Sequence, residues 1–245
     1  MNFFNKSILY IYQDLKVKRK IVIIVMLFII LLMTAATIPN NSAPLLEWNS
    51  TKDFILLFRY EFLHVPAFLI LVGSTYIIND WITIRRYKNR EQIGAVKVLS
   101  VIVLSSLFTF IIMVVGLACT FIVKFILFPN ISNYASLFLF MPKDEPKGSF
   151  IYFICIYFFL TTVIGLLFIL LTAIIRNQVL SAAIIITAVI LDRFTVSLIP
   201  YFLYSSEINS PIVTFVIFIC IITILVNSVG LTSNNEDFFV KEEKI

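Results

Sequence analysis

Side chains able to do chemistry are few in this chain, and they gather at three places. The first is a basic stretch at 81–97, which reads W-I-T-I-R-R-Y-K-N-R-E-Q-I-G-A-V-K. The second is the charged pair at 192–193, and the third is a polar group around Glu61. Charged groups of these kinds dock partner proteins, bind ions or protons, or anchor helices at a membrane surface.

The parts of the common enzyme sites are missing from the sequence. Its glycines are scattered, and none belongs to a G-x-x-x-x-G-K-[ST] phosphate loop. His64 is the single histidine, which excludes paired-histidine metal sites, and no nucleophile motif accompanies it. Cys119, Cys155 and Cys220 lie in three separate apolar runs, as structural thiols do. We therefore expect a protein that is not an enzyme and that holds no metal or cofactor itself.

The composition is typical of a membrane protein. Hydrophobic residues make up 60% of the 245 residues, charged residues make up 13%, and the mean hydropathy is +1.02. A soluble domain carries about 25% charged residues. The apolar runs are long and continuous, which favours membrane-spanning helices over the alternating strands of a barrel. The net charge of +5 lies beside these runs, so it indicates membrane lipid rather than nucleic acid as a partner.

We predict an all-α polytopic membrane protein that forms a single transmembrane domain over 1–245. Residues 1–20 are predicted to be an interfacial helix, because apolar residues recur there at helical spacing before a basic cluster. Six transmembrane helices and a polar cytoplasmic tail follow. The predicted spans and tail are 21–38, 62–79, 99–128, 150–175, 179–204, 211–229 and 233–245.

Charge asymmetry predicts the orientation of these spans. With both termini in the cytoplasm, thirteen of the 19 lysines and arginines fall in cytoplasmic segments and six fall outside. We expect a multi-pass protein of the cell membrane with cytoplasmic termini. Arg176-Asn177-Gln178 is predicted to form a tight inner turn, and Ser210-Pro211 is predicted to start the last span.

The basic hairpin between the second and third spans has the features of a docking helix. Trp81, Ile84 and Tyr87 recur at three-residue spacing beside arginines, and these residue types dominate interface cores. Asn89 is followed three residues later by a glutamine, which resembles a capping box and predicts a helix that begins near Arg90 and continues into the third span. The alternative is a solvated loop whose charge serves only the topology.

This layout resembles the membrane subunit of a type-2 ATP-binding-cassette (ABC) exporter. More narrowly, it is similar to the small permeases of Gram-positive bacteria that accompany drug-efflux and bacteriocin-immunity ATPases. As architecture, the resemblance covers the whole chain: an opening amphipathic helix, six spans and a basic hairpin. As a motif, it rests on I-R-R-Y-K-N-R at 84–90 together with Lys97.

In that family the hairpin is a coupling helix that sits in a groove of a separate ABC ATPase. The resemblance implies that ATP-Mg binds to that partner and that a second permease subunit, identical or different, completes the transporter. Few charges line any span, which favours an amphipathic or hydrophobic cargo such as a peptide or drug. The residues assigned to ATPase docking are Ile84, Arg85, Arg86, Tyr87, Lys88, Asn89, Arg90 and Glu91.

The pair Asp192-Arg193 interrupts the fifth apolar stretch, and three interpretations stay open. One span over 179–204 could bury the pair at membrane depth. Alternatively, the span ends early and 194–204 folds back as a re-entrant segment. The family resemblance favours this segment as an outer cap over the exit path, with Pro200 in it. In the third interpretation Arg193 snorkels to the outer interface.

Arg59, Glu61 and His64 form the third candidate site, which has two interpretations. Glu61 and His64 are three residues apart and share a helix face, so they could line an outer vestibule and confer pH sensitivity. The interpretation we favour is that all three anchor the second helix at the level of the lipid headgroups.

Two other functions are consistent with the sequence. A secondary transporter or channel needs an ion-coupling residue at mid-membrane, for which Asp192 is the candidate, although no inverted repeat supports this class. A non-transporting scaffold or sensor would recruit a partner through its tail. The leading prediction remains an exporter permease that works by alternating access.

Overall fold

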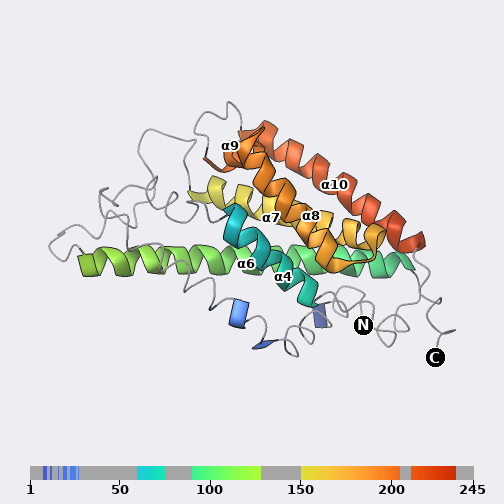
Figure 1. Cartoon of the computed structure of the whole chain (residues 1–245), viewed down its shortest axis with the longest axis horizontal. Coiled ribbons are helices and arrows are strands. Elements are labelled where there is room, and N and C mark those ends of the chain that lie inside the picture. The colour runs from blue at the N-terminus through green and yellow to red at the C-terminus, as the bar shows by residue number, and fades with distance from the viewer. Residues whose placement is uncertain are drawn as a thin grey trace.

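The computed structural model describes isolated positions between Ile8 and Leu27 and the ranges 60–75, 90–127, 150–204 and 211–235. These residues are helical apart from two short turns and contain no strand, which agrees with the predicted all-α class. Figure 1 shows the elements in order. They are the π-helix η1 (Tyr60–His64) and the α-helices α4 (Val65–Thr75), α6 (Arg90–Leu127), α7 (Phe150–Ile175), α8 (Gln178–Phe194), α9 (Leu198–Tyr204) and α10 (Pro211–Asn235).

Three helices are long and apolar enough to cross a membrane. Their apolar segments are Gln92–Val115 in α6, Tyr152–Ile175 in α7 and Ile212–Ser233 in α10. These segments overlap the predicted third, fourth and sixth spans. η1 and α4 together form a shorter apolar helix over Tyr60–Ser74, within the predicted second span and its outer end.

Several predictions fall outside the described residues. The predicted first span and interfacial helix are described only at isolated helical positions, so neither is tested as an element. The hairpin up to Asn89 and most of the tail are outside the described residues altogether.

Local signals in the sequence place the helix ends. α6 begins at Arg90, and α10 begins at Pro211, where a proline fits because the first N–H of a helix has no internal partner. Between α7 and α8, Arg176 adopts a φ of 58°, and the side chain of Asn177 accepts a hydrogen bond from the N–H of Leu180 at 3.1 Å. The predicted tight turn at 176–178 is therefore confirmed.

The predicted fifth span, 179–204, is not one helix. α8 ends at Phe194, and a turn over 195–197 separates it from α9. Ser197 has a φ of 57° in this turn, a conformation that interrupts an α-helix. The interpretation of a single continuous helix is therefore wrong, and the stretch consists of two helices joined by a turn.

α7 is the centre of the bundle. It packs against α10, α6, α8 and α4, and its buried side chains lie around most of its circumference. α10 and α8 instead expose large apolar side chains, such as Ile212 at 74% and Val179 at 79%. A soluble monomer rarely exposes apolar patches of this extent, whereas a membrane helix presents such a face to lipid.

α6 and α10 pack together and run in opposite directions (Figure 1). At one end of the bundle, a Cβ on Gly94 near the start of α6 would lie 3.3 Å from Ser233 near the end of α10. At the other end, η1 contacts the last turn of α8 through Glu61 and Arg193. Residues that the topology prediction puts on one side of the membrane thus meet at one end of the bundle.

We expect Gly165→Ala to destabilise the bundle by about 1–3 kcal/mol, because an added methyl group overpacks this contact. A Cβ on Gly165 in α7 would lie 2.7 Å from Cγ1 of Val101 and 3.1 Å from the ring of Phe68. Gly230→Ala is the matched control, since its Cβ meets nothing within 4 Å. Thermal unfolding in detergent measures both variants, and equal stability of the two would contradict this packing.

Candidate functional site

A buried polar cluster lies where η1 meets the turn between α8 and α9. Nη1 of Arg193 donates a hydrogen bond to Oε1 of Glu61 at 3.0 Å. The Glu61 side chain is fully buried, whereas 21% of the Arg193 side chain is exposed. The guanidinium therefore reaches inward from the surface of the bundle to a carboxylate held inside. The sequence placed these two residues in separate candidate sites, and the structure joins them.

The π-helical turn presents three polar side chains to the interior. Pro66 has no N–H, so it cannot donate to the carbonyl four residues earlier as an α-helix requires. The chain adopts the wider π winding over Tyr60–His64 directly before this proline. Single π-helical turns of this kind occur frequently at functional sites. Tyr60, Glu61 and His64 are all buried in η1.

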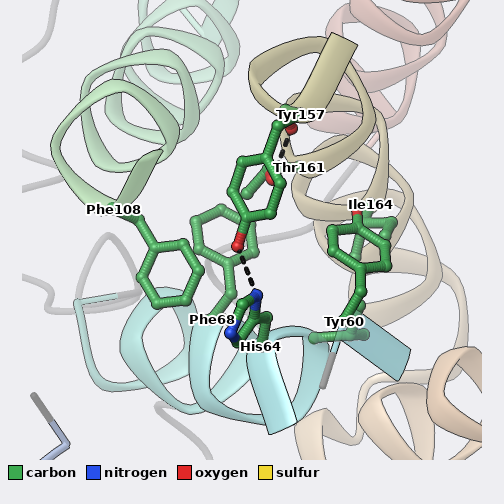
Figure 2. Close-up of a pocket in the computed structure, with 8 residues that line it drawn as sticks. Tyr60, His64, Phe68, Phe108, Tyr157, Thr161 and Ile164 are labelled. Atoms are coloured by element: carbon green, nitrogen blue, oxygen red, sulfur yellow. Dashed lines mark hydrogen bonds between the residues drawn. The ribbon is translucent and has the colours of Figure 1, made fainter. Parts of the chain in front are cut away.

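His64 lies in a pocket of aromatic side chains (Figure 2). Its Nδ1 is 2.9 Å from the hydroxyl of Tyr157 in α7, and the hydroxyl of Thr161 donates to the carbonyl of Tyr157 at 2.7 Å. The rings of Tyr60 and Tyr157 meet edge to face with centroids 5.3 Å apart. Apolar and aromatic side chains of α4, α6 and α7 fill the remaining space, so no water-sized ligand fits there.

The burial of Glu61 and His64 corrects one prediction. Their side chains are 0% and 1% exposed, so the interpretation of these two residues as headgroup anchors is wrong. The pocket around His64 is filled, so His64 faces no open vestibule there. Arg59, the third member of that predicted group, is outside the described residues.

Asp192 holds the start of α9. Its Oδ1 accepts from the N–H of Leu198 at 3.1 Å, and its Oδ2 accepts from the N–H of Ile199 at 2.8 Å. Its carbonyl accepts from the N–H of Ser197 at 2.6 Å. The first N–H groups of a helix lack internal partners, so the carboxylate satisfies them. The sequence suggested an ion-coupling role for Asp192, and the structure shows a capping role instead.

Pro200 belongs to the same local arrangement. It is the third residue of α9, where a missing N–H removes no internal hydrogen bond. The spacing between the acidic residue and the proline was the available signal in the sequence. The cap was not predicted, because the sequence alone does not show that the chain turns over 195–197 and so brings Asp192 next to the start of α9.

The hairpin residues are described only in part. Arg90 and Glu91 are the first two residues of α6. Lys97, which the resemblance grouped with the basic hairpin, has a side chain that is 1% exposed. Its charge is therefore not displayed on the surface, and it cannot contribute directly to a docking face. The other residues assigned to docking, outside the described part of the chain, are Ile84, Arg85, Arg86, Tyr87, Lys88 and Asn89.

Comparison of the chain with protein-family models, with curated proteins and with solved structures finds no match. Its function must therefore be argued from the arrangement of its own residues.

We predict that Arg193→Gln lowers stability by about 1–3 kcal/mol, between the values for exposed and fully buried ion pairs. The reason is that Glu61 would be left as a buried charge without its cation. Adding Glu61→Gln should recover part of the loss, because the buried charge is then removed as well. Thermal unfolding of the single and double variants measures this coupling, and strictly additive losses would contradict a direct pair.

Asp192→Ala should loosen α9 while α8 remains intact. Loss of a capping carboxylate costs about 0.5–2 kcal/mol of helix stability, so backbone amides of Leu198–Tyr204 should exchange faster with deuterium. Thr187→Ala serves as the control, because Thr187 is an exposed residue of α8 away from the turn. Unchanged exchange in α9 would show that the cap contributes nothing to its stability.

Proposed function

We propose that this chain is the membrane permease subunit of an ATP-driven ABC exporter. It moves an amphipathic or hydrophobic peptide or drug outward by alternating access, while a separate ATPase binds and hydrolyses ATP-Mg. The proposal combines the resemblance in layout with the form of α6. It includes a cell-membrane location, six spans, cytoplasmic termini and a second permease subunit.

The observation that carries the proposal is the continuity of α6. It has 38 residues and begins at Arg90, inside the basic hairpin. At about 1.5 Å per residue it is about 57 Å long, well beyond a hydrocarbon core of about 30 Å. It also packs against α7 and α10 along the bundle. A rigid helix that starts at a docking surface and runs through the membrane domain can carry a displacement from one end to the other.

Contacts within the bundle supply a route for that displacement. The start of α6 lies close to α10 at Gly94. A Cβ added to Gly94 would be 3.4 Å from the Cα of Gly230 in α10. At the far end of α10, the ring of Phe218 meets Phe202 of α9 with centroids 5.2 Å apart. Closure of the ATPases would push α6, α6 would shift α10, and α10 would move α9, the proposed outer cap.

The packing of the described bundle supports the proposal of a second permease subunit. The pocket around His64 is filled, and α7 is enclosed on most sides. The cargo path is therefore proposed to lie between two permeases. The apolar faces of α8 and α10 are available to lipid, cargo or that partner.

A proton-coupled secondary transporter is the second candidate. The observation that favours it is Glu61, a fully buried carboxylate in a chain with few intramembrane charges. It replaces Asp192 as the candidate coupling residue. Reconstitution in liposomes separates the two functions: uptake driven by a proton gradient without any ATPase would favour the secondary transporter.

Arg85→Glu combined with Arg90→Glu should abolish co-purification of an ABC ATPase, because two cations of the docking surface become anions. The control is Lys241→Glu combined with Lys244→Glu, which makes the same charge change in the tail. Pull-down from membranes, with insertion verified by fractionation, measures the effect. Equal retention of the ATPase by the hairpin and tail variants would count against docking at the hairpin.

A further inference from the structure

The Glu61 carboxylate is satisfied on one side only. Oε1 accepts the hydrogen bond from Arg193, whereas no donor among the described residues reaches Oε2, which is buried. An ionised carboxylate has about four lone-pair sites, and burying it without hydrogen bonds is costly. A neutral carboxyl group in the same place avoids much of that cost.

Few other titratable groups lie on the described elements that pack against η1. η1 itself contributes Tyr60 and His64, α8 contributes Asp192 and Arg193, and α7 contributes Tyr157. α4 has no titratable side chain. Both oxygens of Asp192 accept hydrogen bonds from α9, whereas among the described residues Glu61 accepts one hydrogen bond, from Arg193.

The ion pair also determines how the outer turn is held. Arg193 follows Asp192, the residue that caps α9, and the hydroxyl of Ser197 donates to the carbonyl of Arg193 at 3.0 Å. The backbone of Arg193 is thus part of the turn, while its side chain ties that turn to η1. Because 21% of the side chain is exposed, the guanidinium can rotate into solvent while the backbone of Arg193 stays in place.

We propose that Glu61 is a proton-binding site whose occupancy controls the attachment of the α8–α9 turn to η1. The proton comes from water and adds to a carboxylate oxygen of Glu61, forming one O–H bond. Arg193 keeps its own protons and charge and swings outward as the ion pair is lost. The turn and α9 then loosen, so acidification opens the proposed outer cap.

The sign of the effect follows from the charges. The ion pair between Glu61 and Arg193 exists while Glu61 is ionised. It is therefore formed at higher pH and is lost as the pH falls. Protonation of His64 would act differently, because it adds a cation near Tyr157 and leaves the Glu61 charge in place. The role of α9 as an outer cap rests on the proposed function, whereas proton binding by Glu61 does not. Loss of the pH response would therefore leave the exporter function untouched.

The test uses the full chain in lipid nanodiscs between about pH 5 and 8, the range over which carboxyl and imidazole groups commonly titrate. Infrared difference spectra detect a protonated carboxyl group, and deuterium exchange follows residues 195–204. Acidification should produce a carboxyl band that Glu61→Gln lacks. The protection of amides at 195–204, relative to intrinsic exchange at the same pH, should fall about tenfold through local opening. Glu61→Gln should exchange rapidly at every pH, whereas Glu61→Asp should keep the pH dependence.

Two further variants make each outcome decisive. Arg193→Gln removes the cation of the ion pair. It should therefore give rapid exchange at 195–204 at every pH, even if Glu61→Gln fails to fold. His64→Gln should retain the pH response. The proposal is overturned if the protection of amides at 195–204, relative to intrinsic exchange, does not change with pH. It is also overturned if the carboxyl band persists in Glu61→Gln, or if the response depends on His64 and not on Glu61.

Discussion

The ion pair between Glu61 and Arg193 is the constraint around which this end of the bundle is arranged. A carboxylate placed inside an apolar helical bundle needs a cation, and Arg193 supplies it from the last turn of α8, where that helix ends beside η1. After the turn, the first N–H groups of α9 have no partner within the helix, and the Asp192 carboxylate accepts hydrogen bonds from them. Charge pairing, helix termination and capping are therefore one connected arrangement.

Elsewhere the bundle is held by close packing. Lipid is as apolar as the side chains of the spans, so burial of apolar surface gives little preference for one helix partner over another. The fit between helix surfaces therefore decides which helices pack together. Val101 and Phe68 pack closely against α7 at Gly165, and α10 packs closely against α6 at Gly94. Both contacts involve α6, which makes this long helix the element best placed to connect the hairpin with the rest of the bundle.

The proposed exporter mechanism and the proton site address opposite ends of the same bundle. α6 begins at the hairpin, where an ATPase is proposed to act, and the Glu61 cluster lies at the end that bears α9. α10 links the two, since it contacts α6 near Gly94 and α9 through Phe218. A change at either end therefore has a packed path to the other.

The sequence by itself determined the helical membrane class, the bounds of α7, the starts of α6 and α10, and the turn after α7. These features depend on hydropathy, caps and prolines that lie within a few residues of one another. Only the tertiary structure decided that Glu61 pairs with Arg193, 132 residues away, and that Lys97 is buried. Such contacts depend on which helix faces pack together, and a uniformly apolar sequence carries little periodic signal to specify those faces.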